Sequence, residues 1–218
     1  MGEHDHQHGH HRHGEGHVHS HAPRREDAKV HSYYQVLGLA IKELLIEKAI
    51  LTEDEIRGMI EFRDSITPAT GAGIVARAWT DPAYKQRLLA DGSQAIGEFG
   101  LNMGGTHLVV VENTPKVHNV IVCTLCSCYP RNVLGLPPAW YKDRAYRARV
   151  VREPRAVLTE FGLLIPESVE VRVHDSTADM RYLVLPMRPA GSQSLSEKEL
   201  AGLVSRDCMI GVAVPRVA

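Results

Sequence analysis

Residues 117–130 read VHNVIVCTLCSCYP, an apolar segment that runs directly into three closely spaced cysteines. The β-branched residues of 117–122 predict a strand that ends at Cys123. Cys123, Cys126 and Cys128 are an odd set, and a disulfide needs Cα atoms several ångströms apart with converging Cβ vectors. Three thiols so close together are better explained as ligands of one soft metal ion. We call residues 123–128 the claw loop and expect the chain to fold around it.

The spacing alone does not say which metal is bound. A structural zinc site or an iron–sulfur cluster needs four ligands, and the sequence has no second Cys-x-x-Cys pair. We expect His118 to lie on a strand face or an interface, and the isolated Cys208 to be a buried thiol. A redox-active thiol group and accidental clustering are the alternatives to a metal site.

The segment from Val122 to Tyr129 resembles the metal motif of the nitrile hydratase α subunit, and Thr124 and Tyr129 resemble its cobalt type. The resemblance covers roughly residues 30 to 214 and continues at 109–115, 133–142, 150–155, 186–191 and 209–212. It implies one Co(III) per α subunit. The implied ligands are the sulfurs of Cys123, Cys126 and Cys128 and the backbone amides of Ser127 and Cys128.

The same resemblance implies a reaction and a partner. Cys126 would be oxidised to the sulfinate and Cys128 to the sulfenate, and Cys126, Ser127 and Cys128 would form the catalytic group. The metal would act as a Lewis acid in adding water to a small nitrile to give an amide, a lyase reaction. Whether the sulfenate or a metal-bound water attacks is left open. The implied partner is a β subunit, in a heterodimer or a heterotetramer, and a protein that loads the cobalt is a further implied partner.

Two alternative functions stay open. The segment Cys128-Tyr129-Pro130-Arg131 and residues 206–215 also resemble the γ subunit of thiocyanate hydrolase, which has the same cobalt claw. Arg131 would then attract an anionic substrate, although an isolated arginine is more often a surface or interface residue. The second alternative is a non-catalytic protein that binds or delivers metal.

Composition restricts the remaining classes. The chain has 218 residues, 44% of them hydrophobic, and a formal net charge of −1, which predicts one core with extensions and does not favour nucleic-acid or membrane binding. The arginine-rich run 144–155 is therefore expected to be a solvated or interfacial face. No apolar run approaches the ~20 residues that span a bilayer and no secretory leader is recognisable, so we expect a cytoplasmic protein.

We predict an α+β chain in three parts. Residues 1–27, with nine histidines in the first 21, are expected to be a disordered tail that either helps deliver metal or is simply solvated. Residues 28–66 are expected to form a helical arm for subunit contact. Their apolar side chains cover more of the helix surface than the single apolar stripe of an ordinary amphipathic helix. Residues 67–218 are expected to form the metal-binding catalytic core. The predicted core has α/β/β/α layers, with the claw loop at a strand end.

Periodicity places the core elements approximately. Strands are expected near 108–111, 117–122, 169–174 and 181–185, with a closing strand at 209–214. A helix is expected over 139–149 after the Pro137-Pro138 pair.

Overall fold

The computed structural model describes residues 32–126 and 128–217. The chain divides into two units, Met1–Glu53 and Asp54–Ala218, and each is described here by itself. The histidine-rich tail predicted over 1–27 lies outside the described residues. The proposed division into an arm over 28–66 and a core over 67–218 stays a prediction.

The described part of the first unit consists mainly of helix α1, Tyr33–Glu47. Its N-terminus carries a capping box: the Ser32 hydroxyl accepts a hydrogen bond from the Gln35 amide, and the Gln35 side chain accepts one from the Ser32 amide. Such a pair satisfies two backbone donors that the first turn would leave unpaired. No residue of α1 is buried within the described chain, although the helix carries exposed apolar side chains at Tyr33, Tyr34, Val36, Leu37, Leu39, Ile41 and Leu44.

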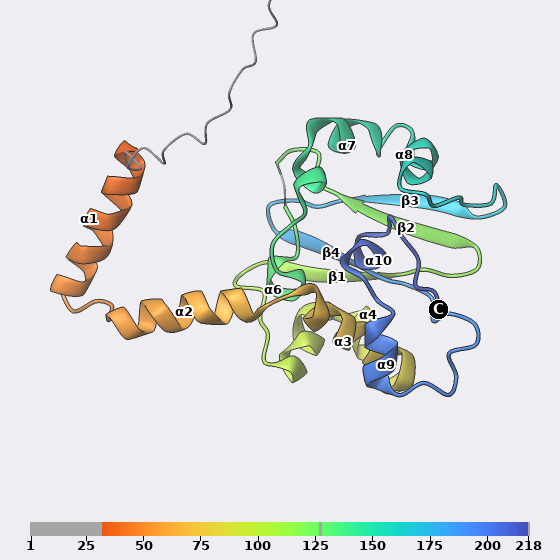
Figure 1. Cartoon of the computed structure of the whole chain (residues 1–218), viewed down its shortest axis with the longest axis horizontal. Helices are drawn as coiled ribbons and strands as arrows, with labels where there is room; N and C mark the ends of the chain where they lie inside the picture. Colours follow the sequence, from red (N-terminus) through yellow and green to blue (C-terminus); the bar gives the residue numbers. More distant parts are fainter. Residues whose placement is uncertain (1–31, 127, 218) are drawn as a thin grey trace, which may run out of the picture. The chain divides into compact units, whose positions relative to one another are not determined.

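The described part of the second unit contains four strands and the remaining helices (Figure 1). The helices are α2 Glu53–Ser65, α3 Pro68–Thr80, α4 Pro82–Ala90, α5 Gly92–Ala95, η1 Ile96–Phe99, α6 Arg131–Leu134, η2 Ala139–Lys142, α7 Arg144–Arg149, α8 Pro154–Glu160, α9 Glu197–Gly202 and α10 Arg206–Ile210. The strands are β1 His107–Glu112, β2 Val117–Val122, β3 Glu170–Asp175 and β4 Met180–Leu185. None of the described helices is long and apolar enough to cross a bilayer.

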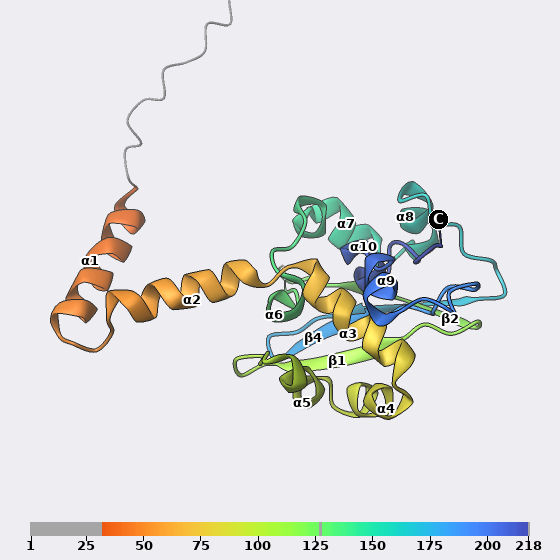
Figure 2. The ribbon, with the colours of Figure 1, turned by 60° about the horizontal axis from the view of Figure 1, so that its bottom comes forward.

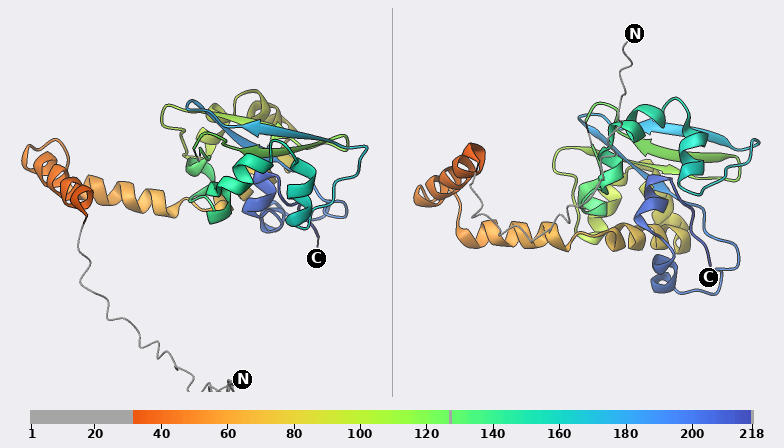
Figure 3. Two further views of the ribbon diagram at one scale, coloured as in Figure 1. Left: turned by 90° about the horizontal axis from the view of Figure 1, so that it is seen from above. Right: turned by 45° about the horizontal axis from the view of Figure 1, so that its top comes forward.

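The strands form two parallel pairs, β1 with β4 and β2 with β3. Figures 1 and 2 show the strands in the middle of the unit, with α7 and α8 on the side of β3 and α4 on the side of β1. Two further views show the same grouping (Figure 3). Helix α10 contacts both β2 and β4. The predicted α+β class is confirmed.

Strand β2, which delivers the chain to the claw loop, is the most buried of the described strands. Val120, Ile121 and Val122 are completely buried. Burying a side chain of this size stabilises a fold by roughly 1.5–3 kcal/mol, so β2 is among the most firmly held segments of the unit. The strand end at Val122 is therefore a rigid support for the loop that follows.

A buried polar network also holds β2 from the side. The Nε2 atom of the His118 ring lies 2.7 Å from the Gly211 carbonyl oxygen, and its Nδ1 atom lies 3.3 Å from the side-chain amide nitrogen of Asn113. The Asn119 backbone amide donates to the Asn113 side chain at 2.7 Å, and His174 on β3 contacts the Asn119 side chain at 2.8 Å. Because buried polar groups are costly unless paired, this network fixes β2 against α10 and β3.

Two elements differ from the sequence prediction. The closing strand expected at 209–214 is wrong. Residues Arg206–Ile210 form helix α10, which begins after a Ser205 cap on the Cys208 amide and ends at Gly211 in the left-handed conformation. The helix expected over 139–149 is interrupted, because Asp143 is extended and caps a new helix by accepting from the Ala145 amide.

Candidate metal centre

The claw loop begins where β2 ends. Cys123 is completely buried, Cys128 is partly buried and Cys126 is exposed. The exposure therefore increases from the strand end towards the middle of the loop, where Leu125 is 87% exposed. The site is therefore buried at Cys123 and open to solvent at Cys126.

The three sulfurs converge on one point. The Sγ atoms of Cys123 and Cys126 lie 3.4 Å apart and those of Cys126 and Cys128 lie 3.0 Å apart. All three lie within 4.8 Å of one another, and no disulfide joins them. Sulfurs this close together could all bind one metal ion with metal–sulfur bonds of about 2.3 Å.

Asp175 fixes the entrance to the loop. Its carboxylate accepts hydrogen bonds from the Thr124 amide at 2.9 Å and from the Thr124 hydroxyl at 2.5 Å. Asp175 is the last residue of β3 and pairs in register with Val122. Parallel pairing brings the carboxyl ends of both strands to the same edge, which places this carboxylate beside a loop more than fifty residues earlier in the chain.

Tyr141 fixes the exit from the loop. Its hydroxyl donates to the Cys128 carbonyl at 2.9 Å, and its ring is completely buried against Tyr129, with centroids 5.1 Å apart. Burial raises the pKa of the Tyr141 hydroxyl above its usual range, so the group stays protonated and remains a donor. Tyr146 supports the preceding strand by donating to the Ile121 carbonyl at 2.8 Å.

Arg147 holds the middle of the loop. Its Nη1 donates to the Cys126 carbonyl and lies 3.5 Å from the Thr124 carbonyl. The sequence placed this residue only in a basic run expected to be solvated or interfacial. Nothing in the local pattern distinguishes Arg147 from its neighbours, because the contact depends on how α7 packs above the loop.

The family assignment follows from comparison with known proteins. The family model for the nitrile hydratase alpha chain matches residues 32–213. The chain belongs to the nitrile hydratase α-chain family. The membership expected from the motif is thereby confirmed.

This family member has characterised relatives of two kinds. It is 53% identical over 178 residues to the low-molecular weight cobalt-containing nitrile hydratase subunit alpha of Rhodococcus rhodochrous. The matched region covers 81% of this chain and 86% of that protein. It is 43% identical over 197 residues to thiocyanate hydrolase subunit gamma of Thiobacillus thioparus, covering 85% and 81% respectively. A solved structure of recombinant thiocyanate hydrolase with partially modified cobalt centers matches with a TM-score of 0.75 at 41% identity, covering 85% of this chain and 91% of that one.

In this nitrile hydratase α chain, the thiols are held close enough to influence one another. Burial and hydrogen bonds from Cys126 and Cys123 raise the pKa of the Cys128 thiol to about 12, while the charge of Arg181 opposes the rise. A thiol must lose its proton to become a metal ligand. Metal uptake by the claw loop is therefore coupled to proton release.

The other predicted residues lie away from the sulfurs. His118 bonds inside the core to Gly211, and Cys208 is buried on α10. Within the described residues, the three cysteines are the one group of three or more His, Cys, Asp or Glu side chains placed to share a metal ion. Ser127 lies outside the described residues, so its predicted role as a ligand and catalytic group stays a prediction.

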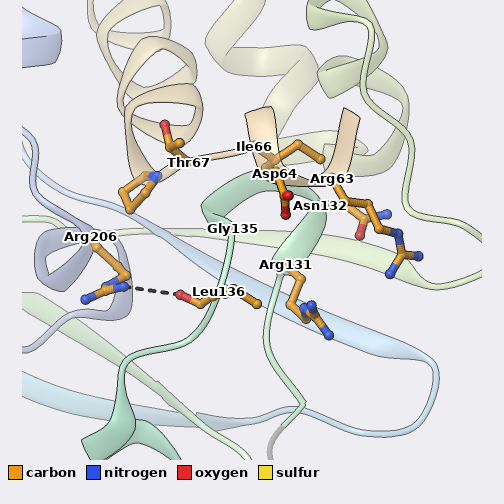
Figure 4. Close-up of a pocket in the computed structure, with 10 residues that line it drawn as sticks. Arg63, Asp64, Ile66, Thr67, Arg131, Asn132, Gly135, Leu136 and Arg206 are labelled. Carbon is orange, nitrogen blue, oxygen red and sulfur yellow. Dashed lines mark hydrogen bonds between the residues drawn. The ribbon is translucent and has the colours of Figure 1, made fainter. Parts of the chain in front are cut away.

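Arg131 is exposed and lies beside a cavity of about 300 Å³ that Arg63 and Asn132 also line (Figure 4). Figure 4 shows Arg206 on the opposite side of the Gly135–Leu136 segment, where its guanidinium donates to the Leu136 carbonyl at 3.2 Å. Arg131 and Arg63 also line a second cavity, which reaches Tyr129 and Arg181 next to the claw loop. The region beside the loop therefore carries positive charge.

Proposed function

We propose that the chain is the α subunit of a cobalt-dependent nitrile hydratase, which adds water to a small nitrile to give the amide. The observation that carries the proposal is the convergence of three sulfurs at the end of β2 in a chain 53% identical to a cobalt-containing nitrile hydratase α subunit. The proposed ligands are the sulfurs of Cys123, Cys126 and Cys128 and the backbone amides of Ser127 and Cys128. They hold one Co(III) per subunit.

The cobalt ion, when bound, supplies a Lewis acid that polarises the nitrile or acidifies water. The protein's own part is to orient the ligands. Asp175, Arg147 and Tyr141 bind backbone groups at the start, middle and end of the loop. Because these contacts use backbone groups of the loop, its cysteine side chains can face the metal and the substrate. We infer that substrate enters from the side of Cys126, the most exposed of the three cysteines.

The proposed active form carries oxidised cysteines, with a sulfinate at Cys126 and a sulfenate at Cys128. Susceptibility to oxidation follows the exposure and thiolate character of the sulfur. The gradient of exposure supports this assignment, because Cys123 is completely buried whereas Cys126 is exposed. Cys123 is proposed to stay an unmodified thiolate.

The proposed partner is a β subunit that completes the substrate pocket, in a heterodimer or a heterotetramer. The exposed apolar side chains of α1 support a role for residues 28–66 as a subunit-contact arm, since an apolar helix with no buried residue needs a covering surface. Residues 67–218 are proposed as the catalytic core. A cytoplasmic location fits the need for reduced cysteines while metal is loaded.

The test is to co-express the chain with a β subunit in cobalt-supplemented cells and measure both hydration of a small nitrile and the intact mass. We expect amide formation, one cobalt per α subunit and three added oxygen atoms confined to the peptide that contains residues 123–128. Unmodified thiols holding a labile zinc ion, with no amide formed, would support a metal-binding or delivery protein instead.

Thiocyanate hydrolysis is the second candidate because Arg131 and Arg63 bring positive charge to the cavities beside the loop, and guanidinium groups attract anions. The same preparation should be assayed with thiocyanate and a small nitrile at equal concentrations. We expect faster turnover of the nitrile. Faster turnover of thiocyanate, lost selectively in an Arg131→Gln variant, would instead assign the chain to the thiocyanate hydrolase class.

A further inference from the structure

The arginine-rich run 144–155 contains one arginine with a different role from its neighbours. Four of its five arginines make contacts away from the claw loop or are exposed. Arg149 forms ion pairs with Glu153 and Glu160, and Arg144 is exposed. Arg152 and Arg155 donate to backbone carbonyls, at residue 148 and at residues 165, 166 and 169 respectively. In the described structure, Arg147 alone of these five donates to the claw loop.

The environment of Arg147 is unusual for a surface arginine. The side chain is partly buried, and its Nε is buried with no hydrogen-bond acceptor among the described residues. Removing part of a guanidinium from water is costly unless its donors are paired. The pairing comes from the carbonyls of Cys126 and Thr124, the two residues on either side of the exposed Leu125.

Of these two carbonyls, that of Cys126 belongs to a residue that the other two anchors do not contact. Asp175 holds the loop at Thr124 through the amide and hydroxyl, and Tyr141 holds it at the Cys128 carbonyl. The Cys126 carbonyl belongs to the peptide bond that follows Cys126. Because a peptide bond is planar, binding its carbonyl oxygen restricts the orientation of the whole peptide plane.

We propose that Arg147 is a positioning residue that holds the claw loop in its metal-receiving shape through the carbonyl oxygens of Thr124 and Cys126. The inference rests on the proposed function, because it assumes that the loop holds a metal. Ligands that are already in place bind more tightly than ligands that must be ordered on binding. The guanidinium charge also lies beside a loop that becomes anionic when its thiols bind metal.

The experiment compares Arg147→Gln, Arg147→Lys and Arg144→Gln in the full-length chain. Arg144→Gln is the matched control because it removes the same charge from the same helix, and Arg144 lines the same surface hollow as Arg147. Each protein is titrated anaerobically with Co(II), and the sulfur-to-cobalt absorption band gives the dissociation constant. Thermal unfolding of the metal-free proteins checks that each variant is folded.

We expect Arg147→Gln to weaken cobalt binding by about 10- to 100-fold, as is usual when a group that orients a metal ligand is removed. Arg147→Lys should recover part of the loss, and Arg144→Gln should match the parent. Equal dissociation constants for Arg147→Gln and the parent would overturn the inference while leaving the proposed function intact. A parent chain that binds no cobalt would instead contradict the proposed function.

A second measurement separates a loss of stability from a misplaced loop. In co-expressed, cobalt-loaded complexes, the oxygen atoms added to the peptide containing residues 123–128 are counted by mass spectrometry for Arg147→Lys and the parent. We expect incomplete or misplaced oxidation in the lysine variant, because the rigid guanidinium plane that carries Nη1 to both carbonyls is replaced by an ammonium group on a flexible stem. A fully parental oxidation pattern, together with parental cobalt affinity, would contradict a positioning role.

Discussion

The claw loop and helix α1 depend on the rest of the molecule in opposite ways. The claw loop is short and is held by side chains from three distant segments, at Tyr141, Arg147 and Asp175. Helix α1 is capped by its own residues and buries none of them within the described chain. The claw loop is therefore shaped by contacts with later segments of the chain, whereas α1, which we propose as a subunit-contact surface, is specified by its own residues.

The largest expected effect comes from removing a ligand. Cys126→Ser should abolish stable cobalt retention and nitrile turnover, because a hydroxyl is a poor replacement for a thiolate on a soft metal site. Cobalt content after dialysis and the rate of amide formation measure the two losses. Cys208→Ser is the matched control, since Cys208 is buried outside the cluster, and it should retain cobalt. Parental turnover by Cys126→Ser would contradict the claw assignment.

The next effect comes from one of the long-range anchors. Tyr141→Phe leaves the partly buried Cys128 carbonyl without its donor and should destabilise the folded chain by about 1–2 kcal/mol. Chemical denaturation of the metal-free protein measures the change. Tyr33→Phe, in the exposed first turn of α1, should change nothing measurable. An unchanged midpoint for Tyr141→Phe would show that the anchor contributes little.

The buried histidines behind the loop predict a dependence of stability on pH. Burial lowers the pKa of His118, opposed by its bond to the Gly211 carbonyl, and burial together with the Arg172 charge lowers the pKa of His174. The unfolded chain therefore binds protons more readily than the folded one. Stability should be fully present above the usual histidine pKa of about 6.5 and should be lost as the pH falls through that value towards the depressed folded pKa values.

This prediction is tested by urea unfolding of the metal-free chain between pH 8 and pH 5. The midpoint should fall with pH, and the fall should be smaller in His118→Gln. A histidine that has the same pKa in the folded and unfolded states does not change the free energy of unfolding with pH. A midpoint that rises on acidification would contradict the network described around β2.

The smallest effect is expected in α1. Ser32→Ala removes the capping box and should cost the helix about 1 kcal/mol, which should reduce helix content seen by circular dichroism only slightly. Because α1 buries no residue within the described chain, the main unfolding transition should stay at its parental midpoint. A shifted main transition would show that α1 supports the core. Binding to a β subunit should weaken, as the exposed apolar side chains would be less well ordered.

Local patterns in the sequence are enough to place strands β1 to β4, the claw loop and the aspartate cap at Asp81. The Asp81 side chain accepts a hydrogen bond from the Tyr84 amide, and Pro82 occupies the first position of α4. Such features depend only on neighbouring residues. The three cysteines were visible for the same reason, since their spacing alone brings their sulfurs together.

Spacing and periodicity do not predict the loop anchors at Tyr141 and Arg147, and Asp175 is indicated only by the family resemblance, which matches it to a position around the metal site or at an interface. Their positions depend on the parallel pairing of β2 with a strand about fifty residues later and on the packing of α7. The strand expected at 209–214 failed for another reason. A short apolar run fits a buried helix end as well as a strand, and the Ser205 cap decides the outcome.

The approach of Gly211 to β2 has a consequence for biosynthesis. A β-carbon at this residue would lie 2.0 Å from the Asn119 carbonyl oxygen, so the turn after α10 lies directly against the strand that precedes the claw. We expect the claw loop to take its final arrangement only after α10 and the turn at Gly211 have been synthesised, so that cobalt insertion follows the synthesis of this later part of the chain.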